Sequence, residues 1–368
     1  MDGPELMEMP VKAFGIGSFN FGINESRKNT LSIKQYMDEV KTTLNKIPSI
    51  EKVLIECHED NEEIIILGDE QNRYPHLTFL KIDFILHISG RVQCELVGYS
   101  ISDIEKFKVT IQHNYYYPIA FVECINAKNY STTPADGVRI VREFLKKEFP
   151  KTNSFITFEY LGPAPFHAEF YIEKSEVNQQ QKITSTETER KGYNKIIFYY
   201  DENKFEDIED AMLNIYEEIE SEVGVFYKIT YDNSMQMKKW EDITLKILNL
   251  MDMENNSGII TKAKNKFYSY QERNKILQEL YLFKAEDEIE NKKIERTINS
   301  EYEGTMQRHL QNYIKKKKSS LEHYPTSSVI EWLKHKEDNS IKIFDIVSRI
   351  TTAILGGIIG GLITYSLK

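Results

Sequence analysis

The clearest fold signal lies in residues 80–97, which read LKIDFILHISGRVQCELV. In the first half of this stretch, apolar and polar residues alternate, as they do in a β-strand with one buried face. The polar positions of the alternation are Lys81, Asp83 and His87. Ser89 and Gly90 form a turn signal, and Cys94 and Leu96 return on the inner face. The stretch therefore predicts a β-hairpin with a polar outer face.

The neighbouring sequence adds helices and further strands to this hairpin. Residues 31–47 and 134–149 have helical patterns, the second with a proline at its first position. Residues 53–57 alternate as a strand, and residues 154–161 and 166–172 predict a second antiparallel pair. Strands alternate irregularly with few helices. The fold class is therefore expected to be α+β, with a mixed or mainly antiparallel sheet.

The α+β domain is expected to cover residues 1–232. Within it, residues 174–192 are polar and turn-rich and predict a flexible loop. Residues 205–223 predict an amphipathic helix, with eight acidic and no basic residues around its apolar stripe. We expect these acids to form a solvated face, or alternatively to dock a basic partner. Residues 225–231 predict a strand.

Residues 233–338 predict a helical region. Six apolar residues there follow one another in steps of four: Ile294, Ile298, Tyr302, Met306, Leu310 and Ile314. Such a stripe drifts around a helix by roughly 40° per step, whereas a coiled-coil seam alternates steps of three and four. We therefore expect this stripe to pack against a globular body or other helices.

Residues 350–367 form a run of 18 residues without a charge. As a helix this run is about 27 Å long, close to the hydrocarbon thickness of a bilayer. Basic residues before the run outnumber those after it, which by the positive-inside rule keeps the N-terminal bulk in the cytoplasm. The sequence predicts one C-terminal transmembrane helix within residues 339–368 and a single-pass protein of the cell membrane. The alternative is a buried, glycine-rich helix in a globular core.

Two sets of residues follow from the predicted span. Glycines four apart let a second helix approach closely, so we expect a homo-oligomer, with bending or lipid fit as the alternative. These glycines are Gly356, Gly357, Gly360 and Gly361. Basic residues before the run are placed to face anionic membrane lipid. These are Lys315, Lys316, Lys317, Lys318, Lys334 and Lys336.

The charge distribution argues against nucleic acid as a partner. Residues 1–263 carry 29 Lys and Arg against 43 Asp and Glu, a net charge of −14. An acidic body repels a polyphosphate backbone, so we expect no nucleic-acid binding by this part of the chain.

Catalytic motifs are sparse. His167 and Glu169 are two residues apart on one face of a predicted strand, and His58 follows another strand, which makes these three the weak catalytic candidates. Their spacing gives no third metal ligand, so no metal site is predicted, and no motif identifies a cofactor. Gly15 and Gly17 lack the third glycine of a phosphate-binding loop.

The stretch around Glu123 resembles the start of the restriction-nuclease pattern, in which an apolar strand ends in an acidic residue. That pattern requires a lysine two residues after the glutamate. This position is Ile125, and the nearest lysine is Lys128. The resemblance therefore stops before the residue that would carry the chemistry.

The leading functional hypothesis is a non-enzymatic, membrane-tethered sensor or effector. In it, the α+β domain binds an unknown cytoplasmic ligand or protein, and the helical region couples it to a self-associating span. Some bacterial stress and phage-defence effectors are thought to have this layout. The alternatives are a membrane-anchored metal-dependent hydrolase or nuclease with its site in the α+β domain, and a passive scaffold.

Overall fold

The computed structural model describes residues 12–24, 30–57, 64–66, 80–101, 103–113, 118–127, 133–161, 168–175, 182–188, 194–255, 259–302, 309–321 and 323–335. The chain divides into two compact units. Unit 1 comprises Met1–Met235 with Lys292–Leu321, and unit 2 comprises Gln236–Asn291 with Glu322–Lys368.

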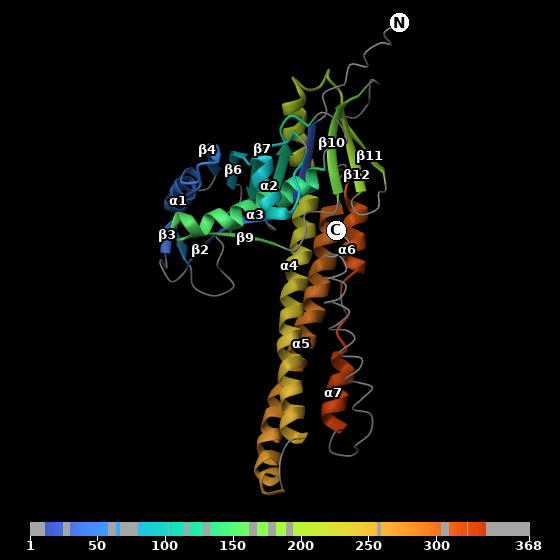
Figure 1. Cartoon of the computed structure of the whole chain (residues 1–368). Helices are drawn as coiled ribbons and strands as arrows, with labels where there is room; N and C mark the ends of the chain where they lie inside the picture. The colour runs from blue at the N-terminus through green and yellow to red at the C-terminus, as the bar shows by residue number, and fades with distance from the viewer. Residues whose placement is uncertain are drawn as a thin grey trace. The chain divides into compact units, whose positions relative to one another are not determined.

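Unit 1 is built on a mixed sheet. In the described residues this sheet has eight strands in the order β11-β12-β10-β1-β8-β7-β6-β4 (Figure 1). These strands are β1 (Lys12–Gly17), β4 (Ile50–Cys57), β6 (Leu80–His87), β7 (Lys106–His113), β8 (Ile119–Cys124), β10 (Ala168–Lys174), β11 (Ile183–Thr188) and β12 (Asn194–Tyr200). Neighbours are antiparallel except β10 and β12, which are parallel. The prediction of an α+β fold with a mixed sheet is confirmed.

Shorter elements complete this part of unit 1. β2 (Phe19–Ile23) pairs with β9 (Ile156–Tyr160), and β3 (Thr30–Ser32) pairs with β5 (Ile64–Ile66). Helix α1 (Ile33–Asn45) begins at Ser32, which forms a reciprocal capping box with Gln35. A short 3-10 helix, η1 (Phe149–Thr152), follows α3 (Pro134–Glu148).

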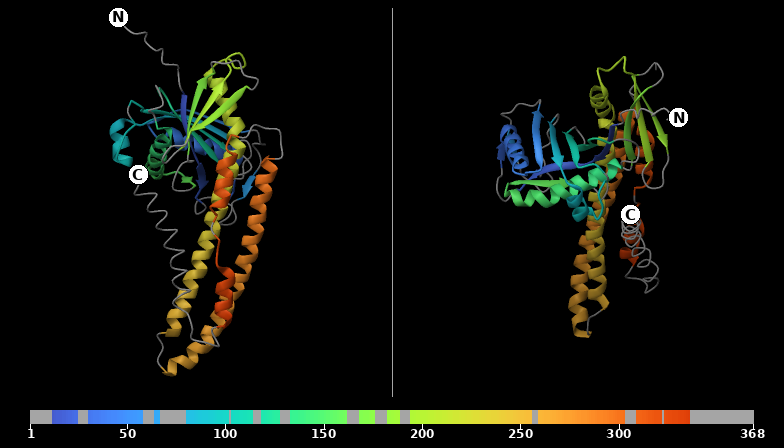
Figure 2. Two further views of the ribbon diagram at one scale, coloured as in Figure 1. Left: turned by 90° about the vertical axis from the view of Figure 1, so that its right-hand side faces the viewer. Right: turned by 45° about the horizontal axis from the view of Figure 1, so that its top comes forward.

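Helix α3 packs on one face of the sheet and α4 (Ile208–Asn255) on the other (Figures 1 and 2). On the α3 side, a Cβ added to Gly15 would lie 2.5 Å from the carbonyl oxygen of Pro134, and one added to Gly17 would lie 2.6 Å from Val138. The two glycines of β1 therefore allow α3 to approach the sheet closely, a packing role unrelated to phosphate.

Helix α4 packs through an aromatic cluster. The Tyr216 ring stacks on Phe121 with a centroid distance of 4.0 Å and meets Phe14 edge to face at 5.0 Å. The apolar stripe continues along α4 through Val225, Phe226, Tyr227 and Ile229, which are all buried. The predicted strand at 225–231 is therefore wrong, because packing against the sheet overrides the strand preference of these residues.

The later helices return to this face of unit 1. The predicted stripe packs in the same core through Ile294 and Ile298 of α5 (Ile259–Tyr302) and through Leu310 and Ile314. This confirms that the stripe contacts a globular body. It is not one helix, because α6 (Gln311–Ser319) begins separately. The Glu222 carboxylate of α4 is 3% exposed and accepts the backbone N–H groups of His309 (3.0 Å) and Leu310 (2.9 Å) just before α6.

The predicted hairpin at residues 80–97 is wrong in its second half. β6 pairs with β4 and β7, and the turn signal instead starts helix α2 (Gly90–Val97), which ends at Gly98 with a φ of 87°. The Gln93 side chain, which is fully buried, donates to the carbonyl oxygens of Ile88 and Ile104 and accepts from the Ile101 N–H. The buried hydrogen bonds of Gln93 thus stabilise a helix where the sequence pattern predicted a second paired strand.

We expect Gln93→Leu to lower the free energy of unfolding by about 3 kcal/mol, because it leaves buried backbone groups without partners. Glu95→Ala, on the exposed side of the same helix, is the control and should cost less than about 1 kcal/mol. Urea unfolding of both variants measures the difference. Equal effects would mean that Gln93 does not hold this turn.

Two other predicted arrangements are corrected. Residues 154–161 and 166–172 do not pair with each other, since β9 pairs with β2 while β10 lies between β1 and β12. The range 174–192, expected to be a loop, contains β11. In both cases pairing with strands that are distant in the sequence determines the structure, and a local sequence pattern does not indicate such pairing.

Unit 2 has a helical core of its own. Residues of α4, α5 and α7 (Thr326–His335) form it: Trp240, Ile243, Ile247, Leu250, Ile276, Leu280, Phe283, Val329, Ile330 and Leu333. The α4 positions alternate steps of three and four, the spacing of a coiled-coil seam. Lys239 pairs with Glu286 at 2.8 Å and Lys246 with Glu279 at 2.7 Å beside this seam.

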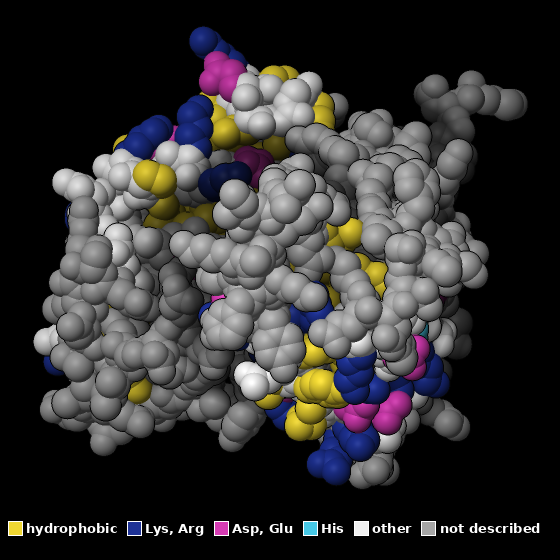
Figure 3. Space-filling view, turned by 90° about the horizontal axis from the view of Figure 1, so that it is seen from below, with side chains coloured by type: hydrophobic (Ala, Val, Ile, Leu, Met, Phe, Trp, Pro, Cys, Tyr) yellow, Lys and Arg dark blue, Asp and Glu magenta, His cyan; other side chains and the backbone are white. Residues whose placement is uncertain are grey.

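The predicted membrane helix is corrected. None of the helices in the described part of the chain is both long enough and apolar enough to cross a bilayer. The longest, α4 and α5, have 48 and 44 residues but carry charged residues throughout. On the face drawn in Figure 3, Lys, Arg, Asp and Glu side chains lie beside the hydrophobic ones. This contradicts the predicted transmembrane helix and the predicted single-pass location in the cell membrane. Residues 350–367 themselves lie outside the described residues.

Candidate functional site

The side of the sheet that faces α4 is divided into an apolar and a polar part. On β1, β8 and β10 this side carries apolar residues, which pack under α4. On β6 and β7 the same side carries mostly polar residues, and the four nearest the middle of the two strands are here called the polar half-face: Lys81, Asp83, Lys108 and Thr110. Residues that alternate with them, such as Phe84 and Val109, are buried in the core on the α3 side. The polar half-face therefore stands on a packed scaffold.

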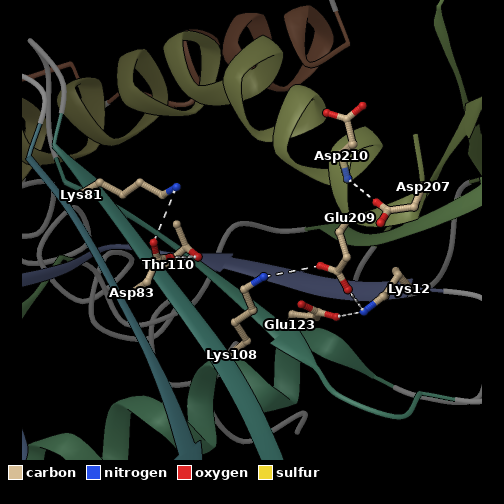
Figure 4. A network of polar contacts seen from close by, with 9 residues as sticks. All are labelled: Lys12, Lys81, Asp83, Lys108, Thr110, Glu123, Asp207, Glu209 and Asp210. Carbon is tan, nitrogen blue, oxygen red and sulfur yellow. Dashed lines mark hydrogen bonds and ion pairs between the residues drawn. The ribbon is translucent and has the colours of Figure 1, made fainter. Parts of the chain in front are cut away.

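Strand register brings the polar half-face together. Asp83 lies opposite Thr110 across β6 and β7, and the Thr110 hydroxyl donates to the Asp83 carboxylate at 2.5 Å. The Lys81 ammonium lies 3.5 Å from the other oxygen of Asp83. Lys108 lies opposite Glu123 of β8. The half-face thus places ammonium and carboxylate groups next to one another, over a buried Thr110 hydroxyl that holds Asp83 (Figure 4).

An ion bridge joins this half-face to α4. The Lys12 ammonium lies 2.6 Å from Glu123 Oε1 and 2.5 Å from Glu209 Oε1, while Glu209 Oε2 lies 3.4 Å from the Lys108 ammonium (Figure 4). Glu209 stands in the first turn of α4, where the helix dipole favours a negative charge. The ion bridge, defined as Lys12, Glu123, Lys108 and Glu209, thus connects three strands with the start of one helix.

The members of the ion bridge differ in the exposed fraction of their side chains. The Glu123 side chain is 2% exposed, Lys12 26%, Lys108 33% and Glu209 44%. The inner pair is therefore the costly one to break, because a buried charge without a partner is strongly unfavourable. Glu209, on the outside, is the member that solvent or a ligand reaches most readily.

The ion bridge also shifts the pKa values of Lys12, Glu209 and the neighbouring Tyr216. Burial alone would lower the pKa of Lys12, but the hydrogen bonds and charges of Glu123 and Glu209 outweigh it and raise that pKa. Burial alone would raise the pKa of Glu209, but Lys12 and then Lys108 outweigh it and lower that pKa. Burial, with the nearby charges of Glu123, Glu209 and Asp83, raises the pKa of Tyr216 well above its usual range. At neutral pH, Lys12 is therefore positively charged, Glu209 is negatively charged and Tyr216 is uncharged.

The catalytic candidates from the sequence do not join this site. His58 and His167 lie outside the described residues. Glu169 is 5% exposed, accepts a hydrogen bond from the Tyr171 hydroxyl, and points to the side of β10 opposite Phe170. Within the described segments, no group of three or more His, Cys, Asp or Glu residues is placed to hold a metal ion.

Three of the basic candidates contact other side chains within their own unit. Lys318 pairs with Glu295 at 2.9 Å, and Lys317 lies over the Phe226 ring. Lys315 and Lys316 lie on α6 with them, and in unit 2 Lys334 lies over the ring of Tyr281. The remaining candidates lie outside the described residues: Lys336, Gly356, Gly357, Gly360 and Gly361. No contact in the described residues tests the lipid-facing role of these lysines, which stays a prediction.

Sequence reasoning found half of the polar half-face and missed the ion bridge. Lys81 and Asp83 are the polar positions of the alternation in residues 80–97. Lys12 and Glu209 are separated by 197 positions in the chain, so no local pattern links them. The acidity of the helix at 205–223 was one available signal, and the acidic Glu123 near the end of an apolar strand was another.

Comparisons with protein-family models, with curated proteins and with solved structures find no match for this chain. The site is therefore interpreted from its own geometry.

We expect Lys12→Met to lower the free energy of unfolding by about 3 kcal/mol, because it strands the buried Glu123 carboxylate. The double variant Lys12→Met/Glu123→Leu should recover most of this loss, since no unpaired charge remains. Urea unfolding of wild type, both single variants and the double variant measures the coupling. Additive losses would show that the two side chains do not act as a pair.

The lowered pKa of Glu209 predicts a pH dependence. Stability from this group is fully present above its unfolded pKa, near 4.5, and is lost as the pH falls through its lower folded value. Glu209→Gln should therefore cost about 0.5–1 kcal/mol at pH 7 after solvent screening, and progressively less below pH 4.5. Urea unfolding between pH 7 and pH 3 measures this difference. Glu217→Gln, at an exposed position of α4, should show no such convergence.

Proposed function

We propose that this chain is a non-enzymatic binding module, which recognises a small polar ligand at the polar half-face and responds through the first turns of α4. The observation that carries the proposal is the position of Glu209. Its carboxylate belongs to α4 but pairs with Lys12 of β1 and Lys108 of β7. Lys108 is also part of the polar half-face.

The polar half-face has the properties of a recognition surface. Its groups differ in charge and in hydrogen-bonding capacity, and they project from strands whose other face is fully packed. Lys81, Asp83 and Lys108 are partly exposed, with side-chain exposures of 30%, 22% and 33%. Polar groups fixed by a rigid scaffold bind ligands with little loss of conformational entropy.

A ligand at this surface would act on α4 by competition. Each oxygen of Glu209 uses one lysine, so a ligand that engages Lys108 removes one of the two contacts of the carboxylate. The apolar stripe of α4, with Met212, Ile215 and Tyr216, is buried in the core and keeps its place. The response is therefore confined to the first turns of the helix. The size of this response is limited by the difference between the ligand's affinities for the protein with Glu209 bound to Lys108 and with Glu209 released.

The rival hypothesis of an enzyme has less support. Glu169, the one catalytic candidate among the described residues, is buried beside Tyr171 and lies away from the polar half-face. The self-associating and membrane-directed parts of the sequence hypothesis depended on the span, so they form no part of this proposal.

The test is a thermal-shift screen of the full chain against organic acids, amino acids, sugars and nucleotides, followed by hydrogen exchange of α4. We expect a ligand that raises the Tm of the wild type and changes amide protection in the first turns of α4. Lys108→Gln should abolish both effects, because it removes the ammonium group that links the half-face to Glu209.

Lys146→Gln, on α3 at the other side of the sheet, is the matched control and should leave both effects intact. A screen without any Lys108-dependent shift would refute the proposal. So would a Lys108-dependent ligand that leaves the exchange of α4 unchanged.

A further inference from the structure

We infer that the polar half-face takes its ligand through a carboxylate group, which occupies the position that the Glu209 side chain holds in the free protein. This inference rests on the proposed function and specifies the ligand class. It assigns Glu209 a second role, as a built-in competitor whose own carboxylate fills the binding position until a ligand displaces it.

The geometry of the two lysines fits a carboxylate. Glu209 presents one oxygen to Lys12 at 2.5 Å and the other to Lys108 at 3.4 Å, so the two ammonium groups are spaced to accept one two-oxygen anion. Both lysines stand on strands of the central sheet, with β8 between β1 and β7. Lys12 also pairs with the buried Glu123 at 2.6 Å, so it keeps one partner when Glu209 leaves. The position is therefore preformed.

Exposure makes the exchange feasible. Glu209 is the most exposed member of the ion bridge, at 44%, and it is the member supplied by the helix. Its longer contact, to Lys108, faces the polar half-face and is the weaker of the two. Ion pairs at this degree of exposure contribute little net free energy, so a ligand carboxylate has little to overcome.

Charge balance favours a carboxylate over a phosphate. With Glu209 in place, Lys12 and Lys108 face Glu123 and Glu209, and the four charges cancel. Without Glu209, one positive charge is left, which a single carboxylate neutralises. A phosphate monoester would bring a charge of about −1.5 to −2 at pH 7, an excess beside Glu123 and Asp83. The ligand class is thus a monocarboxylate with a polar body, which Lys81 and Asp83 are placed to contact.

Chemical rescue tests the inference on the full chain. In Glu209→Ala the carboxylate position is vacant, so sodium acetate should raise the Tm in a saturable way, whereas sodium chloride at equal ionic strength should not. Acetate should bind this variant about two- to fivefold more tightly than the wild type, because the wild type must first release Glu209. Lys108→Gln/Glu209→Ala should lose the acetate effect. Glu217→Ala, from an exposed site on α4, should respond to acetate no more than the wild type does.

Two outcomes would overturn the inference. One is an acetate effect on Glu209→Ala no larger than that of chloride. The other is a stronger effect of inorganic phosphate than of acetate, which would exclude the carboxylate class. After either outcome, a neutral ligand that still requires Lys108 and still changes amide protection in α4 would support the proposed function. Conversely, acetate rescue without any ligand-dependent change in α4 would support the site and refute the sensing function.

Discussion

The packing of α4 on the β1, β8 and β10 part of the sheet is the contact on which the rest of unit 1 depends. It centres on Tyr216, whose ring stacks on Phe121 and meets Phe14 edge to face, with Phe14 in turn stacked on Phe170. Each buried aromatic ring removes roughly 150–250 Å² from water, which makes such a cluster a dominant source of stability. Its position also determines which polar groups of the helix reach the sheet.

This packing determines which partners the acidic residues of α4 contact. Glu209 reaches Lys12 and Lys108 at one end, while Glu222 accepts two backbone N–H groups before α6. Between them, Glu218 lies 3.4 Å from Nε2 of His309, whose other ring nitrogen is 2.7 Å from the Ser185 hydroxyl. A helix that reads from sequence as a solvated acidic face thus directs several carboxylates at partners inside unit 1. Other acidic residues of the stretch 205–223, among them Glu206, Asp207 and Glu217, are exposed, so the predicted docking of a basic partner stays a prediction.

Local signals in the sequence predicted local structure well. The helix expected at 134–149 is α3, which starts at the expected proline, and the strand expected at 53–57 lies within β4. The hairpin at 80–97 failed because Ser89 and Gly90 suit a helix start as well as a turn, and the buried bonds of Gln93 decide between them. Of the candidate site, only the polar positions of β6 were predictable.

The remaining partners of the site come from distant parts of the chain. Lys12 meets Glu123 and Glu209 only because β1 and α4 are packed on the same sheet, which alternation and hydropathy do not encode.

The placement of β1 in the middle of the sheet has a consequence for the order of assembly. Lys12 of this strand lies opposite Ile172, and Phe14 lies opposite Glu123, so both neighbours of the strand are made much later than the strand itself. During synthesis, β1 therefore waits until β10 has emerged before its second edge is covered. Contacts of such large sequence separation slow folding, because a long loop must close before they form. Until then one edge of the strand presents unpaired backbone N–H and C=O groups, and the growing chain is exposed to aggregation through that edge.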